Sequence, residues 1–116
     1  MADTFNISDA FISYSRRDKA FVQKLEQALV SLDHEIWVDW EDIPPTANWW
    51  REIQAGIDAA DNFIFVISPD SVDSEVCARE IAYAVDQHKR FIPVLYREVV
   101  DPDLRAKMHP AINSHN

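Results

Sequence analysis

The sequence predicts an α/β domain built on a doubly wound parallel sheet. Short apolar runs rich in β-branched and aromatic residues alternate with amphipathic stretches that have helical spacing. The apolar runs are nearly continuous, as in parallel strands covered on both faces, and right-handed crossovers between them give an open sheet. A length of 116 residues fits one domain, and 47% apolar residues is the usual share for a globular protein with a buried core.

The first half of the chain predicts two strands and one helix. The strands are expected at residues 10–14 and 35–39, and Asp18 is expected to cap the helix between them. Residues 40–47 form a polar loop, in which two adjacent prolines prevent a strand or helix from continuing. The apolar stripe of the helix recurs at spacings of three and four, and consists of Phe21, Leu25, Ala28, Leu29 and Leu32.

The second half repeats the alternation. Asn48 is expected to cap a second helix, a nearly all-apolar strand follows at 62–67, and a third helix runs from Asp73 or Ser74 to about His88. The apolar stripes of these two helices are Trp49, Ile53, Ile57 and Ala60, and Cys77, Ile81, Ala84, Val85 and His88.

A fourth strand is predicted at 91–96, where Pro93 favours a sheet edge or a bulge. Residues 97–116 are expected to be loop, with a short helix at 104–108. Four strands with three covering helices leave one edge and one face under-covered. We therefore expect a domain truncated before its last strand and helix.

Composition excludes several classes of function. The formal charge of −9 opposes binding to nucleic acid or to an anionic membrane surface. One glycine, Gly56, leaves no G-x-G-x-x-G turn and no P-loop. One cysteine, Cys77, excludes an internal disulfide and a cysteine-based zinc site and suits a reducing cytoplasm. The sequence shows no metal-ligand spacing, no apolar run long enough to cross a bilayer and no signal-peptide core.

Glu80 is the most informative single residue. In open parallel sheets ligands bind at the carboxyl ends of the strands, and the third predicted helix begins at such an end. Glu80 lies three residues after Cys77 and four before Ala84, at the edge of the apolar stripe. Desolvation there would raise its pKa, as in many functional carboxylates. The alternative is that Glu80 extends to water at the helix flank, paired with Arg79 or Arg16.

Four motifs in the correct order resemble the conserved boxes of Toll/interleukin-1 receptor (TIR) domains, in a bacterial style. The resemblance covers roughly residues 8–98 and divides the chain into a tail, 1–8, and a TIR domain, 9–116. The segments that carry it are 9–18 (first strand and turn), 37–39 with 41–45 (second strand and BB loop), 68–71 with Ser74-x-x-Cys77-x-x-Glu80 (third strand end and next helix), and 91–94 (fourth strand).

The resemblance implies a flavodoxin-like fold and, as in many bacterial, plant and axonal members, cleavage of NAD at the nicotinamide–ribose bond. The catalytic glutamate of the family ends the S-x-x-C-x-x-E motif, which here is Glu80. The implied substrate-binding positions are Tyr14, Ser15, Arg16, Trp37, Asp39, Trp40, Ile43 and Cys77, and the implied BB-loop interface is Glu41, Asp42, Ile43, Pro44 and Pro45.

Two hypotheses follow from the resemblance. The first is a cytoplasmic NAD glycohydrolase, activated by self-association, that takes NAD as its substrate, needs no cofactor or metal and is fused to a sensor or oligomerisation domain. The alternative is a non-catalytic scaffold for TIR–TIR contacts. Glu80 favours the enzyme, because adaptor TIR domains commonly lack a competent glutamate there. One departure is Val76, where many active members have a tryptophan; Trp49 or Trp50 is an alternative aromatic wall.

Overall fold

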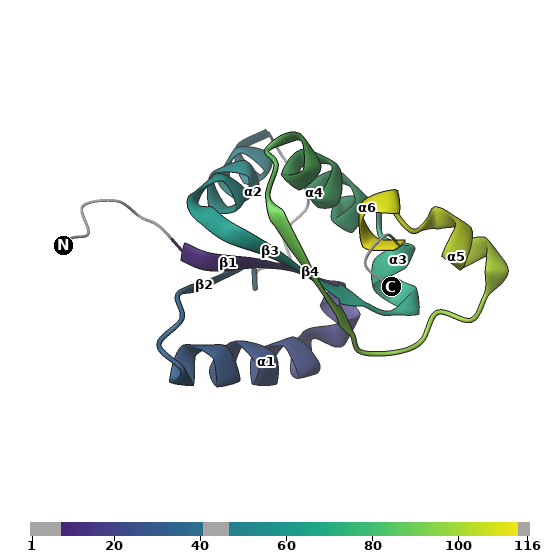
Figure 1. The fold of residues 1–116 in the computed structure, drawn as a ribbon, viewed down its shortest axis with the longest axis horizontal. Coiled ribbons are helices and arrows are strands. Elements are labelled where there is room, and N and C mark those ends of the chain that lie inside the picture. The colour runs from purple at the N-terminus through teal and green to yellow at the C-terminus, as the bar shows by residue number, and fades with distance from the viewer. Residues whose placement is uncertain (1–7, 41–46, 114–116) are drawn as a thin grey trace.

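The computed structural model describes residues 8–40 and 47–113. Within them, four parallel strands form one sheet in the order β2-β1-β3-β4. Helices α2 and α4 cover one face, α1 lies against the other, and α3, α5 and α6 gather at the carboxyl end of β3 (Figure 1). The elements are β1 (Ser8–Ser13), a 3₁₀ turn (Arg16–Asp18), α1 (Lys19–Ser31), β2 (Ile36–Val38), α2 (Ala47–Ala59), β3 (Ala60–Ile67), α3 (Pro69–Val72), α4 (Glu75–Asp86), β4 (Arg90–Leu95), α5 (Pro102–Lys107) and α6 (Pro110–Asn113).

The strand order confirms the doubly wound α/β sheet. The chain leaves β1 toward β2 on one side and returns through β3 to β4 on the other, so the order reverses next to β1. In such folds the crevice for a ligand lies outside the carboxyl ends of the strands at this reversal. Pro93 lies in β4 at the sheet edge, as predicted, where its missing N–H is tolerated.

Strand alternation divides the core into two layers. Phe11, Phe63 and Phe65 face α2 and α4, whereas Ile12 and Ile64 face α1. On the first face the sheet register aligns four aromatic residues, one from each strand, in a single row. Consecutive ring centroids along this row, Trp37–Phe11–Phe63–Phe91, are 4.9, 5.6 and 5.0 Å apart.

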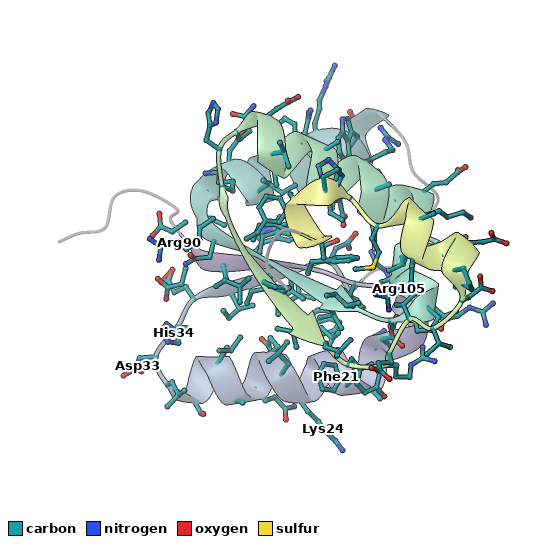
Figure 2. All side chains as sticks on the ribbon, turned by 45° about the vertical axis from the view of Figure 1, so that its right-hand side comes forward. Phe21, Lys24, Asp33, His34, Arg90 and Arg105 are labelled. Atoms are coloured by element: carbon teal, nitrogen blue, oxygen red, sulfur yellow. The ribbon has the colours of Figure 1, made fainter. Side chains whose placement is uncertain are left out.

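Helix α1 is amphipathic as predicted, but its buried side differs from the predicted stripe: Ala28 is exposed, whereas Val22, outside that stripe, is fully buried. Lys24 points away from the sheet, and Phe21 lies beside the end of β4, where its ring stacks on Tyr96 at 4.1 Å (Figure 2). Leu32, the last residue of the predicted stripe, caps the helix and is exposed. Among the described residues no helix has the length and apolar character needed to cross a membrane.

Several predicted caps and boundaries are wrong, for local reasons. Asp18 precedes α1 but makes no side-chain cap hydrogen bond, because its buried carboxylate is used elsewhere. Asn48 lies inside α2, and Ala60 begins β3 directly after the helix, so its burial belongs to the sheet. His88 follows the end of α4 in a left-handed conformation, with φ 58°, and is exposed.

The short helix α3 was not predicted. Its N-terminus is stabilised by a capping box, in which the Ser68 side chain accepts from the Ser71 N–H and the Ser71 hydroxyl interacts with the Ser68 backbone. The predicted short helix at 104–108 is found as α5, starting two residues earlier with Asp101 as its N-cap. A further turn, α6, follows where only loop was expected.

Candidate active site

Glu80 lies in the second turn of α4, on the side that faces the sheet. The helix begins where the Ser74 side chain accepts from the Cys77 N–H. The buried side chains of α4 are Cys77, Glu80, Ile81 and Ala84, so the carboxylate belongs to the apolar stripe itself. Glu80 is 4% exposed. The alternative interpretation, in which Glu80 extends to water at the helix flank, is therefore wrong.

Ser13 provides the hydrogen bond to this carboxylate. Alternation along β1 places Ser13 on the same face as Phe11, toward α4. The Ser13 hydroxyl donates to Glu80 Oε1 at 2.7 Å, and both side chains are buried. The Glu80 side chain is thus held at the C-terminal end of β1, the strand next to the reversal of strand order.

Burial raises the pKa of Glu80 to about 7, since the charged form loses its hydration. The Ser13 hydrogen bond and the positive charge of Arg16 lower this pKa, whereas the negative charge of Asp39 raises it. The carboxyl group is consequently close to half ionised at neutral pH. In this poorly solvated position its charge would interact strongly with a nearby cation.

Cys77 lies one turn before Glu80 and is fully buried. Burial, and secondly the charge of Glu80, raise the pKa of the thiol to about 12. The thiol therefore stays protonated at neutral pH and is unsuited to nucleophilic attack. In this structure Cys77 is a small apolar neighbour of the carboxylate.

Asp39, directly after β2, makes polar contacts with Arg16, Trp49 and Tyr14. Arg16 Nη2 lies 2.9 Å from Asp39 Oδ2, and the Trp49 indole N–H donates to the same oxygen at 3.0 Å. The Tyr14 hydroxyl donates to the Asp39 backbone carbonyl at 2.8 Å. These contacts tie the first turn after β1 and the first turn of α2 to the end of β2.

Tyr14 and Trp40 belong to the apolar layer on the α1 face of the sheet, whereas Glu80 comes from α4 on the other face. Their rings meet edge to face at 5.8 Å, and the Arg16 guanidinium lies 4.8 Å from the Tyr14 ring centroid. Ser15 is half-buried, and its hydroxyl accepts from the Arg17 N–H to cap the 3₁₀ turn. The predicted residues Ile43, Glu41, Asp42, Pro44 and Pro45 lie outside the described residues.

A pocket of about 370 Å³ opens between the end of β2 and α2. Three predicted substrate-binding residues line it, namely Trp37, Asp39 and Trp40. Trp49, suggested as an aromatic wall, forms part of the lining, together with Val38, Glu52 and Ile53. Glu52 is exposed and lies three residues after Trp49, so both are on one face of α2.

The remaining predicted residues do not line this pocket. Tyr14 and Arg16 contact Asp39, which lines the pocket, but do not line it themselves. Glu80 and Cys77 are buried near the end of β1. A separate, mainly apolar pocket of about 280 Å³ lies between α3–α4 and α5–α6 and contains none of the predicted site residues. In the described part of the chain, no three His, Cys, Asp or Glu residues gather closely enough to hold a metal ion.

Comparison with known proteins identifies the fold and the family. Among solved structures, the TIR domain of the Toll-related receptor TRR-2 from Hydra magnipapillata superposes with a TM-score of 0.71 at 23% identity, covering 88% of this chain and 81% of that one. The TIR domains of the activated Roq1 resistosome, which recognises the pathogen effector XopQ, give a TM-score of 0.69 at 23% identity over 92% of this chain and 67% of theirs.

A metazoan TIR-STING receptor from C. gigas gives a TM-score of 0.71 at 23% identity, with 98% of this chain matched to 38% of that one. At this level of identity these three likenesses establish the fold. The family model described as "TIR domain" matches residues 10–115, which is nearly the whole chain. The chain therefore belongs to the TIR domain family.

Proposed function

We propose that this TIR domain is a NAD glycohydrolase with Glu80 as its catalytic residue. The observation that carries the proposal is a carboxyl group buried at the carboxyl end of β1, fixed by the Ser13 hydroxyl and with a pKa of about 7. A buried acid of this kind is costly for folding, since its charge is poorly solvated, and such groups are concentrated at functional sites.

The chemistry needs one ionised carboxylate. When the bond between ribose C1′ and the nicotinamide nitrogen breaks, its electron pair moves to the nitrogen and neutralises the pyridinium. The ribose then carries a positive charge, as in glycoside cleavage. Ionised Glu80 stabilises that charge electrostatically. Nicotinamide leaves as a neutral molecule, so it needs no proton from a general acid.

The intermediate cation is then captured in one of two ways. Water attacks C1′, loses a proton and gives ADP-ribose, or a ring nitrogen of the adenine of the same molecule attacks and gives a cyclic ADP-ribose isomer. The pocket beside Asp39 supports binding of the substrate. Its tryptophans, Trp37, Trp40 and Trp49, suit a flat heteroaromatic ring, and Arg16, which pairs with Asp39 of the lining, suits a phosphate group.

The test is release of free nicotinamide from NAD by the purified domain, measured by chromatography across a range of protein concentrations. Glu80→Gln keeps the shape of the side chain, removes its charge and should lower the rate at least about a hundredfold. The matched control is Glu75→Gln, the same change at an exposed position on the same helix, which should retain the rate. Undiminished cleavage by Glu80→Gln would overturn the assignment.

One observation favours the alternative, a non-catalytic scaffold for TIR–TIR contacts. Glu80 is nearly inaccessible and does not line the pocket, so substrate must gain access to it. A scaffold would self-associate without releasing nicotinamide at any protein concentration. Sedimentation velocity establishes the concentrations at which the protein is associated, and release or absence of nicotinamide at those concentrations separates the two functions.

The proposal extends to the biological setting. Structural neighbours include a Toll-related receptor, the TIR domains of an activated resistosome that recognises a pathogen effector, and a TIR-STING receptor, which supports a role in immune signalling. We infer that self-association activates this domain, that a sensor or oligomerisation domain is fused to it, and that NAD is its substrate and no cofactor is required. The buried free thiol of Cys77 favours a cytoplasmic location, and the style of the motifs favours a bacterial source.

A further inference from the structure

Ser13 and Glu80 form a polar pair inside an otherwise apolar layer. Ser13 is the last residue of β1, and its side chain points toward α4 on the same face as Phe11. Ser13 is 1% exposed, and the contact with Glu80 joins residues 67 apart in sequence. The layer around the pair is built from aromatic and aliphatic side chains of β1, β3, α2 and α4.

Folding alone gives no reason for a hydroxyl at this position. A buried hydroxyl without a partner costs free energy, and an alanine would pack there without that cost. With Glu80 opposite, the hydroxyl instead satisfies a carboxylate that the layer cannot otherwise solvate. The Ser13 hydroxyl is therefore explained by the Glu80 carboxylate that it solvates. The carboxylate itself lowers stability, so stability does not explain the pair.

The hydrogen bond leaves the two carboxylate oxygens in different situations. Oε1 accepts from Ser13 at 2.7 Å, while Oε2 has no hydrogen-bond partner among the residues that the structure describes. A hydroxyl has one proton to donate, so it fixes one oxygen and with it the plane of the carboxyl group. The second oxygen keeps its capacity to accept from a substrate hydroxyl or to face a cation.

We propose that Ser13 is a positioning residue for NAD cleavage: its hydroxyl holds Glu80 Oε1 so that Oε2 is presented to the ribose. The inference rests on the proposed function. Ser13 acts through Glu80, and it also favours the ionised carboxylate, which is the form that stabilises the ribose cation. Its loss should change the catalytic step more than the binding of NAD.

The experiment compares Ser13→Ala, the hydroxyl-retaining Ser13→Thr and Ser68→Ala. Ser68 is an equally buried serine directly after β3, and its hydroxyl donates to Asp18 and not to Glu80. Two readouts are collected for each variant. The first is the titration of the Glu80 carboxyl by ¹³C NMR, assigned with Glu80→Gln, and the second is the pH dependence of kcat and KM for nicotinamide release.

Ser13→Ala should raise the titration midpoint of Glu80 by about one pH unit. The acid limb of the pH profile of kcat should shift to higher pH by the same amount. At neutral pH kcat should fall about tenfold with KM nearly unchanged, the expected effect of losing one charge-assisted hydrogen bond. Ser13→Thr should restore most of both values. Ser68→Ala should lower thermal stability and leave the midpoint and the acid limb in place.

The two readouts separate failure of the inference from failure of the proposed function. If the wild-type domain cleaves NAD and Ser13→Ala changes neither the midpoint nor kcat, the positioning role is wrong and the proposed function stands. If the midpoint moves but the wild-type domain releases no nicotinamide at any concentration, the proposed function is wrong and the positioning role falls with it. An equal decrease of kcat in Ser13→Ala and Ser68→Ala, without a midpoint shift, would show a structural effect only.

Discussion

At the scale of the residue, Glu80 links stability to pH. Between pH 4.5 and about 7 the folded chain keeps this carboxyl protonated while the unfolded chain ionises it, so the free energy of unfolding falls as pH rises. The full shift corresponds to about 3 kcal/mol, fully present as stability below pH 4.5 and lost above about 7. Urea unfolding of wild type and Glu80→Gln over this range should show the wild type losing stability relative to the variant. Parallel pH curves would contradict the raised pKa.

Trp49 gives a second prediction at this scale. Trp49→Phe removes the indole N–H that donates to Asp39 Oδ2 and keeps most of the buried ring. We expect KM for NAD to rise several-fold and the free energy of unfolding to fall by about 1–2 kcal/mol, because an Asp39 oxygen loses a donor. The neighbouring change Trp50→Phe, at a ring that stacks on Arg79, is the control. Equal KM values in the two variants would exclude a role of the Asp39 contact in binding.

Spacing placed Glu80 at the edge of an apolar stripe but left open whether its side chain is buried or extends to water; the structure shows it buried. Its catalytic role stays a prediction from the resemblance. Its partner Ser13 was missed, since alternation shows which face a strand residue occupies but not which side chain lies opposite it 67 residues away. Asp18 was assigned to a local cap for the same reason. Its carboxylate instead accepts from Ser68 Oγ at 2.5 Å and Arg97 Nη2 at 2.8 Å, both far away in the sequence.

At the scale of the element, the single glycine determines how closely α2 approaches the sheet. A Cβ at Gly56 would lie 2.8 Å from Trp37 Cε2, and the Trp37 ring is itself stacked on Phe11 and cannot move freely. In an exposed helix Gly→Ala stabilises by about 1 kcal/mol. Here we expect Gly56→Ala to lower the free energy of unfolding by about 1–2 kcal/mol, because overpacking outweighs helix propensity.

A double-mutant cycle isolates the cause of that loss. In a Trp37→Val background the clash is removed, so Gly56→Ala should become stabilising by roughly the propensity difference. Chemical denaturation of the four proteins measures the coupling. If Gly56→Ala has the same effect in both backgrounds, the contact between α2 and the Trp37 ring does not determine stability at this position.

The elements that the sequence predicts well are those with strong periodicity. Continuous apolar runs identified the four strands found in residues 8–40 and 47–113, and spacings of three and four identified α1, α2 and α4. Failures lie at junctions. Ala60 is apolar in either state, and the direct passage from α2 into β3 leaves no turn residue to mark the boundary. Helix α3 is only four residues long, so it has no apolar periodicity from which to predict it. It depends instead on a reciprocal capping box between Ser68 and Ser71.

At the scale of the whole molecule, the site is an assembly of strand ends that alternation and topology bring together. Ser13 and Tyr14 point to opposite faces of the sheet at the end of β1, Asp39 follows β2 beside them, and Glu80 comes from the far side of the strand-order reversal. The predicted parallel sheet with ligands at its carboxyl edge already implied this convergence. It did not indicate that Glu80 is absent from the described residues that line the pocket beside Asp39.

The net charge of −9 gives the last prediction, which concerns the dependence of activity on self-association. Copies of an acidic domain repel one another at low ionic strength, and the screening length falls from about 10 Å at 0.1 M salt to about 3 Å at 1 M. If association activates the domain, nicotinamide release per molecule should increase with protein concentration. The increase should begin at a lower concentration in about 0.5 M than in about 0.05 M sodium chloride.

Saturating NAD is required in this measurement, because salt also weakens attraction between Arg16 and an anionic substrate, which would affect KM. Sedimentation velocity under the same conditions should show larger species appearing with the activity. Glu80→Gln serves as the control, since it should associate like the wild type without releasing nicotinamide. Activity per molecule that is independent of concentration at both salt levels would show that the monomer is the active species, and association would then have another role.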